Sequence, residues 1–266
     1  MKAAKLQKVA NYATKKMKKR GTTMTGYNKN DPETIQQMFG SIAKNYDKAN
    51  GILSMQMHKH WNAQLVEQIA KSKQSMSLLD LCCGTGDIAF QFLKKFQHPQ
   101  SAILVDFCEE MLVCAQEKAQ RFNLSHHDIK YIQANVQELP LESEQVNCVS
   151  MAYGIRNVKD PLKCLQEAYR VLKPGGMIGI LELTKPKNPL IRFGHSLYLR
   201  IVLPTLGKWI TANQEAYQYL CNSIGTFIPS IHLEELLKKA GFVYTKIQPL
   251  TFGVATILIG WKPSNA

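Results

Sequence analysis

Residues 78–87 read Leu78-Leu79-Asp80-Leu81-Cys82-Cys83-Gly84-Thr85-Gly86-Asp87, an apolar run that meets an acid and then two glycines one residue apart. Glycine has no Cβ, so the backbone can turn tightly here and approach a ligand closely. The helix-like segment that follows offers free N–H groups and the positive end of its dipole. The pattern predicts a nucleotide-type cradle at the carboxyl end of a parallel strand.

A second apolar run, residues 102–105, ends in Asp106, where a carboxylate can accept both ribose hydroxyls of an adenosine. Residues 84–89 also fit the loose dinucleotide pattern, which is a weak signal when it stands alone. Asp80 inside the loop would repel a pyrophosphate but can accept hydrogen bonds from the ammonium group of an amino-acid moiety. The loop therefore favours S-adenosylmethionine as cofactor and leaves an NAD-linked oxidoreductase as a distant alternative.

Strand-like and helix-like runs alternate from residue 76 onward. Strands are predicted at 77–82, 101–106, 129–134, 145–152 and 176–184, and helices at 86–96, 108–121, 159–173 and 230–241. This alternation requires crossover connections and predicts a parallel sheet of the α/β class, doubly wound and Rossmann-like. The Lys173–Gly176 run predicts a sharp turn, and residues 243–250 and 251–261 predict an antiparallel hairpin at the sheet edge. We therefore expect seven strands, the last of them antiparallel.

Three segments are predicted along the chain. Residues 1–30 form a basic arm, residues 31–75 a helical cap over one edge of the core, and residues 76–266 the core. An inserted helical lid is expected at about 186–228, because residues 191–210 are mostly apolar and are interrupted by Pro204 and Gly207. We expect residues 191–210, together with Tyr217 and Tyr219, to form either a tunnel for an apolar chain or an addition to the hydrophobic core.

The net charge of +13 comes largely from the arm, where nine lysines and arginines precede Asp31, the first acid. Its apolar residues recur roughly at helical spacing, so the arm could lie on an anionic membrane or a nucleic acid, or stay a solvated tail. No apolar run approaches the length that spans a bilayer, and no secretory signal pattern is visible. These features predict a cytoplasmic protein.

The seven cysteines are scattered and odd in number, which predicts reduced thiols rather than a disulfide framework. Adjacent Cys82 and Cys83 are best interpreted as small residues that fill a tight turn. The chain has no C-x-x-C or H-x-x-H pair, so no metal site is predicted.

Two longer motifs resemble a known family. The first is Tyr46-Asp47-Lys48-Ala49-Asn50-Gly51-Ile52-Leu53-Ser54 with His58 and Trp61, and the second is Arg170-Val171-Leu172-Lys173-Pro174-Gly175-Gly176 with Glu182 and Thr184. Both are similar to motifs of the ubiquinone/menaquinone biosynthesis C-methyltransferases (UbiE-like), a family of class I S-adenosylmethionine-dependent methyltransferases. Ala49 stands where the family usually has Met, and Thr184 where it usually has Ser. The resemblance extends from about residue 35 to Lys262.

The resemblance implies methylation of a polyprenylated quinol ring. Demethylmenaquinol is the first choice of substrate and a methoxy-benzoquinol of the ubiquinone route the second, and one enzyme could accept both. It also implies a homodimer and peripheral docking on the inner face of the membrane through the arm and the lid, or a mitochondrial matrix location in a eukaryote. A nucleic acid is not expected as partner. A nucleic-acid methyltransferase, prompted by the charge, and a non-catalytic cofactor-binding assembly protein of a quinone-synthesis complex are the alternatives.

The resemblance and the loop pattern together nominate the site. Cofactor-binding residues are expected to be Tyr46, Asp80, Gly84, Thr85, Gly86, Asp106, Phe107, Met111, Asn135 and Val136. Arg156 is expected to stabilise a phenolate or to orient a water that takes the proton, Asn157 to position the substrate or the methionine end, and His58 to act as a base. The structural alternatives are a salt bridge for Arg156, a packed histidine beside Trp61, and a cap role for Asn135.

Overall fold

The computed structural model describes residues 31–70, 77–98, 100–202 and 214–264. Helices and helical turns of these residues are α2 (Pro32–Ile42), η1 (Ala43–Asn45), α3 (Tyr46–Leu53), α4 (Met57–Ile69), α5 (Asp87–Leu93), α6 (Glu109–Arg121), η2 (Ile155–Asn157), α7 (Pro161–Val171), α8 (Pro189–Leu197), η3 (Tyr198–Val202), α10 (Gln214–Thr226), α11 (Ser230–Lys239) and η4 (Thr251–Gly253). Strands are β1 (Ser77–Leu81), β2 (Ser101–Asp106), β3 (Asp128–Gln133), β4 (Val146–Ala152), β5 (Leu172–Leu183), β6 (Val243–Leu250) and β7 (Ala255–Trp261).

The strands form one seven-stranded sheet in the order β3-β2-β1-β4-β5-β7-β6. Strands β1 to β5 are parallel to one another, whereas β7 runs antiparallel to both β5 and β6. The predicted α/β sheet with an antiparallel final strand is therefore confirmed. Because β1 is joined to β2 on one side and to β4 on the other, the strand order reverses there, which in such sheets places ligands at the carboxyl ends.

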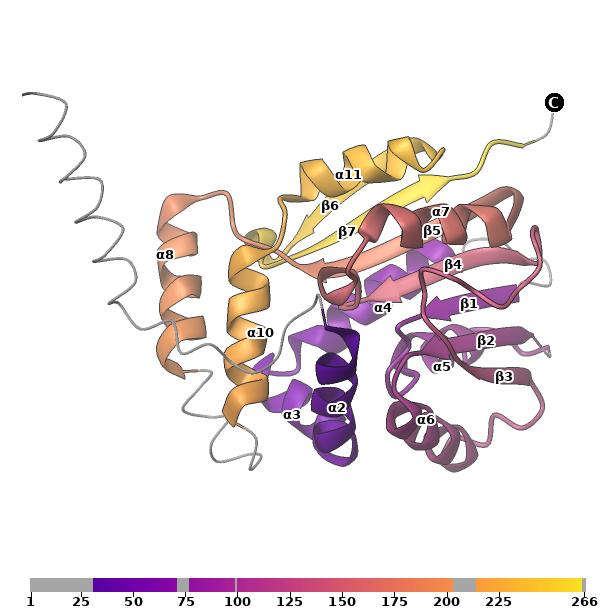
Figure 1. Ribbon diagram of the computed structural model, residues 1–266, viewed down its shortest axis with the longest axis horizontal. Helices are drawn as coiled ribbons and strands as arrows, with labels where there is room; N and C mark the ends of the chain where they lie inside the picture. Colours follow the sequence, from indigo (N-terminus) through magenta and orange to yellow (C-terminus); the bar gives the residue numbers. More distant parts are fainter. Residues whose placement is uncertain (1–30, 71–76, 99, 203–213, 265–266) are drawn as a thin grey trace, which may run out of the picture.

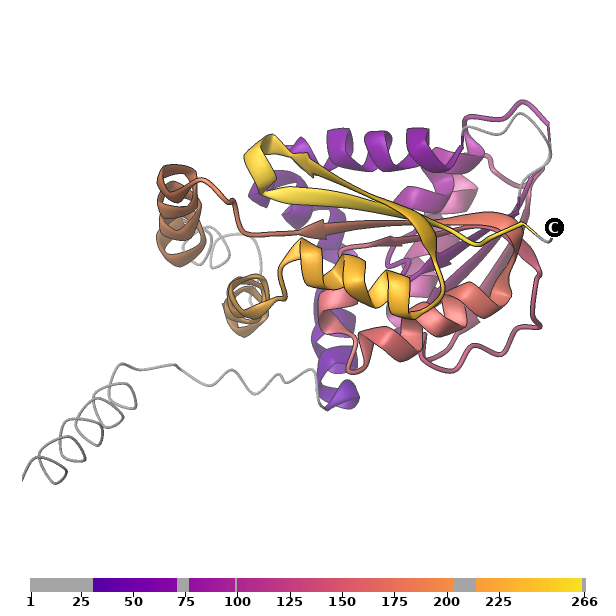
Figure 2. The ribbon, with the colours of Figure 1, turned by 90° about the horizontal axis from the view of Figure 1, so that it is seen from above.

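Helices cover both faces of the sheet (Figures 1 and 2). One face packs against α4, α5 and α6, and the other against α7 and α11. The sequence predicted that the helices of the cap cover an edge of the core, but α4 lies on the sheet face, where Leu65 and Ile69 are fully buried.

The turn predicted at Lys173–Gly176 is wrong, because these residues lie inside β5, which begins at Leu172. The pairing of β4 with β5 shifts register at this point, and the chain after β7 supplies partners: the Gly175 amide donates to the Lys262 carbonyl. Gly175 keeps a left-handed φ of +76°, so the Pro-Gly-Gly run forms a bulge inside β5 rather than a separate turn before it.

The remaining helices stand beyond the carboxyl ends of the parallel strands (Figure 1). They are α2, η1 and α3 of the cap and α8, η3 and α10 of the lid. Helix α8 begins where Asn188 accepts hydrogen bonds from the amides of Leu190 and Ile191, and the Tyr198 hydroxyl donates to the Leu53 carbonyl, tying the lid to the cap. Pro204 and Gly207 lie outside the described residues. Among the described helices, none has the length and apolarity to cross a membrane.

Candidate active site

Three adjoining pockets lie at the carboxyl ends of the parallel strands. The strand-end pocket, about 120 Å³, lies between α2 and the residues that follow β1, β2 and β4. The connecting pocket, about 40 Å³, surrounds Asp80, and the lid pocket, about 480 Å³, lies among α3, α4, α8, α10 and η4. Tyr46 and Tyr153 line all three pockets, so the three spaces meet at these two rings.

The pockets collect nearly every residue nominated from the sequence. The strand-end pocket is lined by Tyr46, Gly84, Asp106, Phe107, Met111, Asn135, Val136 and Asn157. The connecting pocket adds Asp80, Thr85 and His58, and the lid pocket adds Arg156. Gly86 lines none of the three.

Asp80 is the penultimate residue of the apolar strand β1 and is only 1% exposed. Its Oδ1 accepts a 2.6 Å hydrogen bond from the Ser150 hydroxyl, but its Oδ2 is buried without a partner among the described residues. Burial raises the pKa of Asp80 from 3.8 to about 7. An unpaired buried oxygen is costly unless a ligand donates to it, so Oδ2 is suited to a cationic N–H donor.

The glycine loop needs glycine for two different reasons. Gly84 has φ +53°, and a Cβ there would point toward the Tyr46 ring, into the space that a ligand would take. Gly86 has φ +82°, and a Cβ there would come within 2.5 Å of the Phe90 ring. Gly84 therefore keeps a pocket wall open, whereas Gly86 lets α5 begin close against the sheet.

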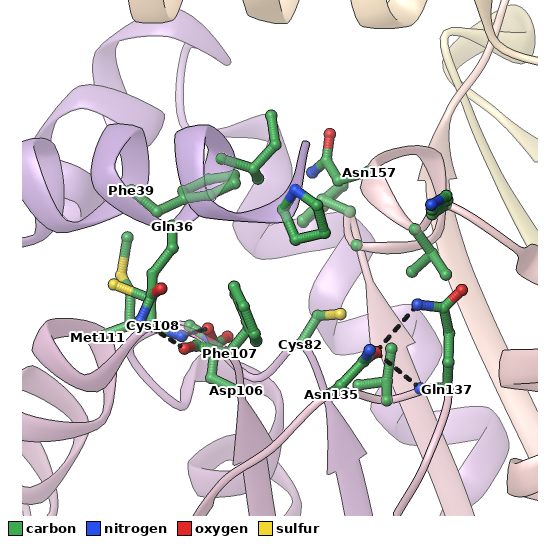
Figure 3. A pocket seen from close by; sticks show the side chains of 18 of the residues that line it. Gln36, Phe39, Cys82, Asp106, Phe107, Cys108, Met111, Asn135, Gln137 and Asn157 are labelled. Carbon is green, nitrogen blue, oxygen red and sulfur yellow. Dashed lines mark hydrogen bonds between the residues drawn. The ribbon is translucent and has the colours of Figure 1, made fainter. Parts of the chain in front are cut away.

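Asp106 shapes the loop through both carboxylate oxygens (Figure 3). Oδ2 accepts from the Gly84 amide at 2.8 Å and Oδ1 from the Cys108 amide at 2.9 Å. Burial raises the pKa of Asp106, while these amides act in the opposite direction. A carboxylate has about four lone-pair sites, more than these amides use, so Asp106 can still accept from a ligand hydroxyl.

Phe107 and Met111 lie beside Asp106 at the strand-end pocket, and Gln36 and Phe39 of α2 lie over it (Figure 3). Asn135 is exposed, and its Oδ1 accepts from the Gln137 backbone amide and side chain, each at 3.0 Å. This is an Asx-type turn in the loop after β3, where no helix begins for Asn135 to cap. The side-chain amide of Asn135 keeps its own donors for another partner.

Two tyrosines separate the three pockets. Tyr153 has φ +59°, a strained conformation for a bulky residue, and its hydroxyl donates to Asn62 at 2.9 Å. Burial raises the pKa of Tyr46, which is hydrogen-bonded to Asn50. Asn50 lines both the connecting and the lid pockets but was not nominated, although it stands in the Tyr46–Ser54 motif that the sequence singled out.

His58 lies on α4 with its ring between the connecting and lid pockets. Its Nδ1 is 2.6 Å from Ser54 Oγ, and that hydroxyl donates its proton to the Asn50 carbonyl at 2.7 Å. With the hydroxyl donating to Asn50, Ser54 accepts from Nδ1–H, and in this tautomer the lone pair of the neutral ring lies on Nε2. Burial lowers the pKa of His58, so the ring is neutral at pH 7 and able to take a proton.

Arg156, in η2, forms a buried ion pair with Glu182 at the end of β5. Its Nη1 is 2.6 Å from Glu182 Oε1 and also donates to the Tyr153 carbonyl at 2.5 Å. Its Nε is buried without a partner among the residues that the structure describes, while the side chain lines the lid pocket. Arg156 therefore forms the salt bridge that was its structural alternative, and the same side chain also lines the lid pocket.

Asn157 lines the strand-end pocket rather than the lid pocket, and its Oδ1 accepts from the Tyr219 hydroxyl at 3.0 Å. The side chain of Tyr217 lies outside what the structure describes.

All seven cysteines are free, and burial raises the pKa of the Cys82 and Cys83 thiols well above their usual range. Within the described ranges, no group of three or more metal-ligating side chains gathers.

Comparison with known proteins gives the family. A model described as the ubiE/COQ5 methyltransferase family matches residues 25–262. The demethylmenaquinone methyltransferase of Protochlamydia amoebophila is 55% identical over 90% of this chain and 99% of that protein. The protein of the same name from Chlamydia pneumoniae is 41% identical over 86% of this chain and 95% of its own length.

Solved structures show the same fold at low identity. A SAM-dependent methyltransferase from Aquifex aeolicus aligns with TM-score 0.54 at 18% identity, over 75% of this chain and 88% of that chain. The cyclase SpnF aligns with TM-score 0.57 at 14% identity, over 87% and 97%, so the fold alone does not fix the reaction. The family match does what the fold cannot: the chain belongs to the ubiE/COQ5 methyltransferase family and is an S-adenosylmethionine-dependent methyltransferase.

Proposed function

We propose that this protein methylates a ring carbon of a polyprenylated quinol, with demethylmenaquinol as the acceptor. The observation that carries the proposal is the 55% identity, over nearly the whole length, to a relative named demethylmenaquinone methyltransferase. The lid pocket supports it, because its lining is largely apolar and it adjoins the connecting pocket through His58, Tyr46 and Tyr153. An apolar pocket of this kind suits a ring that carries a prenyl chain better than a nucleic-acid base.

The described residues fit S-adenosylmethionine, which supplies an electrophilic methyl group when bound. Asp80 Oδ2, buried and unpaired, would accept from the ammonium of the methionine part. Gly84 leaves room at the wall, and Asp106 would accept from the ribose hydroxyls. Phe107 and Met111 would flank the adenine, and the exposed Asn135 amide would contact its edge.

His58 and Arg156 would raise the electron density of the acceptor ring from within the lid pocket. The quinol hydroxyl gives its proton to Nε2 of His58, and Nδ1–H of the same ring stays bound to Ser54. Arg156, held by Glu182, offers its unpaired Nε–H and its charge to the resulting phenolate oxygen. Both side chains act on the acceptor, so the protein activates the nucleophile rather than the methyl donor.

The acceptor is tested by methyl transfer from labelled S-adenosylmethionine to demethylmenaquinol and to the methoxy-benzoquinol, with the oxidised quinones as controls. Product from the naphthoquinol is the expected result. Product from the benzoquinol alone would move the protein to the ubiquinone route. No product from either quinol, with cofactor binding intact, would contradict the quinol assignment.

His58→Gln is expected to lower kcat by about 10²- to 10⁴-fold, the usual contribution of a general base, with little change in the affinity for the cofactor. In the wild type, kcat should fall as the pH drops through a value below 6.5, because burial lowers the pKa of the base and protonation removes its lone pair. The pH dependence of kcat measures both effects. His60→Gln, on the exposed side of the same helix, is the control. A His58→Gln profile that keeps the acidic limb would exclude His58 as the base.

We also propose that the lid helix docks on an anionic bilayer and lets the prenyl chain enter from the lipid. Leu190 is 80% and Phe193 69% exposed on α8, while Ile191 and Tyr198 of the same segment line the lid pocket. Exposed Met55 and Phe252 line that pocket as well. Residues 185–202 carry two lysines, two arginines and no acid, which suits anionic lipid.

The double variant Leu190→Ser/Phe193→Ser is expected to bind phosphatidylglycerol-containing vesicles at least tenfold more weakly, since each apolar side chain contributes about 1.5–3 kcal/mol on burial. Vesicle co-sedimentation measures the loss, and Ile231→Ser on α11 is the control for a generally less apolar surface. Deletion of residues 1–30 should weaken binding further. Equal binding by the double variant would contradict docking through α8.

The homodimer and the cytoplasmic location stay predictions.

A further inference from the structure

A buried lysine joins three segments of the site that are far apart in the sequence. Lys118, on α6, has a side chain that is 8% exposed, and its Nζ lies 2.5 Å from Asp47 Oδ2 of α3. It lies 2.6 Å from Asp87 Oδ1 at the start of α5 and donates to Thr85 Oγ1 at 2.8 Å. All three N–H donors of the ammonium are therefore used. We call these four residues the lysine bridge.

Thr85 closes the lysine bridge into a ring. Its hydroxyl donates to Asp47 Oδ1 at 2.6 Å and accepts from Lys118. Asp47 is thus held through both carboxylate oxygens, which fixes its orientation as well as its position. The sequence predicted a cofactor contact for Thr85 through its hydroxyl or its backbone, and the hydroxyl is occupied by the bridge.

The bridge is anchored one residue from two pocket walls. Asp47 follows Tyr46, which lines all three pockets, and Thr85 follows Gly84, which lines two. We propose that Lys118 is a positioning residue that clamps cap helix α3 onto the glycine loop and so holds Tyr46 over the connecting pocket. The proposal rests on the cofactor site and does not depend on which quinol is methylated.

The charges of the lysine bridge suit a positioning role better than a purely structural ion pair. Two carboxylates face one ammonium, so the bridge carries a net negative charge where a strut would need only one acid. Thr85 and Asp87 line the connecting pocket beside Asp80. Lys118 therefore offsets part of the negative charge beside the pocket and holds the two carboxylates together.

Lys118→Met removes the charge and keeps most of the chain length. Binding of S-adenosylhomocysteine, measured by calorimetry on the full chain, should weaken by about tenfold or more, because the two carboxylates then repel each other. Hydrogen exchange in residues 46–53 with the ligand bound should rise toward that of the free protein, while exchange in α5 stays protected. Lys163→Met, which breaks the exposed Lys163–Glu138 pair, is the matched control and should match wild type.

Thr85→Val and Asp47→Asn serve as second variants if Lys118→Met does not fold. Each opens the ring but leaves Lys118 paired with Asp87, and each should weaken binding by several-fold with the same change in exchange at α3. Binding within twofold of wild type by the folded variants, with α3 still protected, would overturn the proposal and leave the bridge a structural strut. Because the ligand is the demethylated cofactor, a wrong quinol assignment cannot produce either result.

Discussion

Asp80→Asn is expected to weaken S-adenosylhomocysteine binding by about 10- to 150-fold, since a hydrogen bond to a charged group contributes about 1.5–3 kcal/mol. The substitution keeps an oxygen for the Ser150 hydroxyl but places a neutral amide where Oδ2 is unpaired. The affinity of the wild type should fall by about tenfold per pH unit below about 7, because the ionised carboxylate binds the ammonium. Asp80→Asn should lose that dependence. Calorimetry between pH 5.5 and 8.5 measures both.

The same substitution should stabilise the cofactor-free protein. Burial raises the pKa of Asp80 from 3.8 to about 7, so ionising it in the folded protein costs up to about 4 kcal/mol, fully expressed above pH 7. The gain in unfolding free energy should be large at pH 8 and small at pH 4, where Asp80 is protonated in the folded state. Urea unfolding measures it, and exposed Asp128→Asn is the control. Unchanged stability at pH 8 together with unchanged binding would remove Asp80 from the site.

Glu182→Gln is expected to destabilise the protein by about 3–5 kcal/mol, because it leaves the Arg156 guanidinium buried without its counter-charge. Glu182 is fully buried and also accepts from the backbone amides of Arg156 and Leu183. Urea unfolding measures the loss. Glu138→Gln, in the exposed pair with Lys163, should cost less than about 1 kcal/mol.

The double variant Arg156→Met/Glu182→Met separates stability from catalysis. Replacing both charges by apolar side chains should recover most of the lost stability, since neither charge is then left unpaired. Methyl transfer should stay low, because no guanidinium then faces the lid pocket. A stable and fully active double variant would show that Arg156 serves only the fold.

The order of strands and helices could be predicted from the sequence because apolar periodicity and turn residues are local. The bounds of β2 and β6 match the structure at both ends. The start of β5 was wrong because Gly175 and Gly176 pair with the chain after β7, which is distant in the sequence. The place of α4 on the sheet face was also missed, because an amphipathic stripe does not say which surface it covers.

The sequence by itself determined the elements of the cradle: an acid near the end of β1, glycines that let the backbone turn, and a second acid at the end of β2. These depend on residue type and spacing, which the parallel alternation turns into one edge of the sheet. Only the tertiary structure decided the pairings that set the charges of the site, Arg156 with Glu182 and Lys118 with Asp47 and Asp87. Those partners stand 26 or more residues apart, so strand order and helix packing bring them together, and burial gives their charges strength.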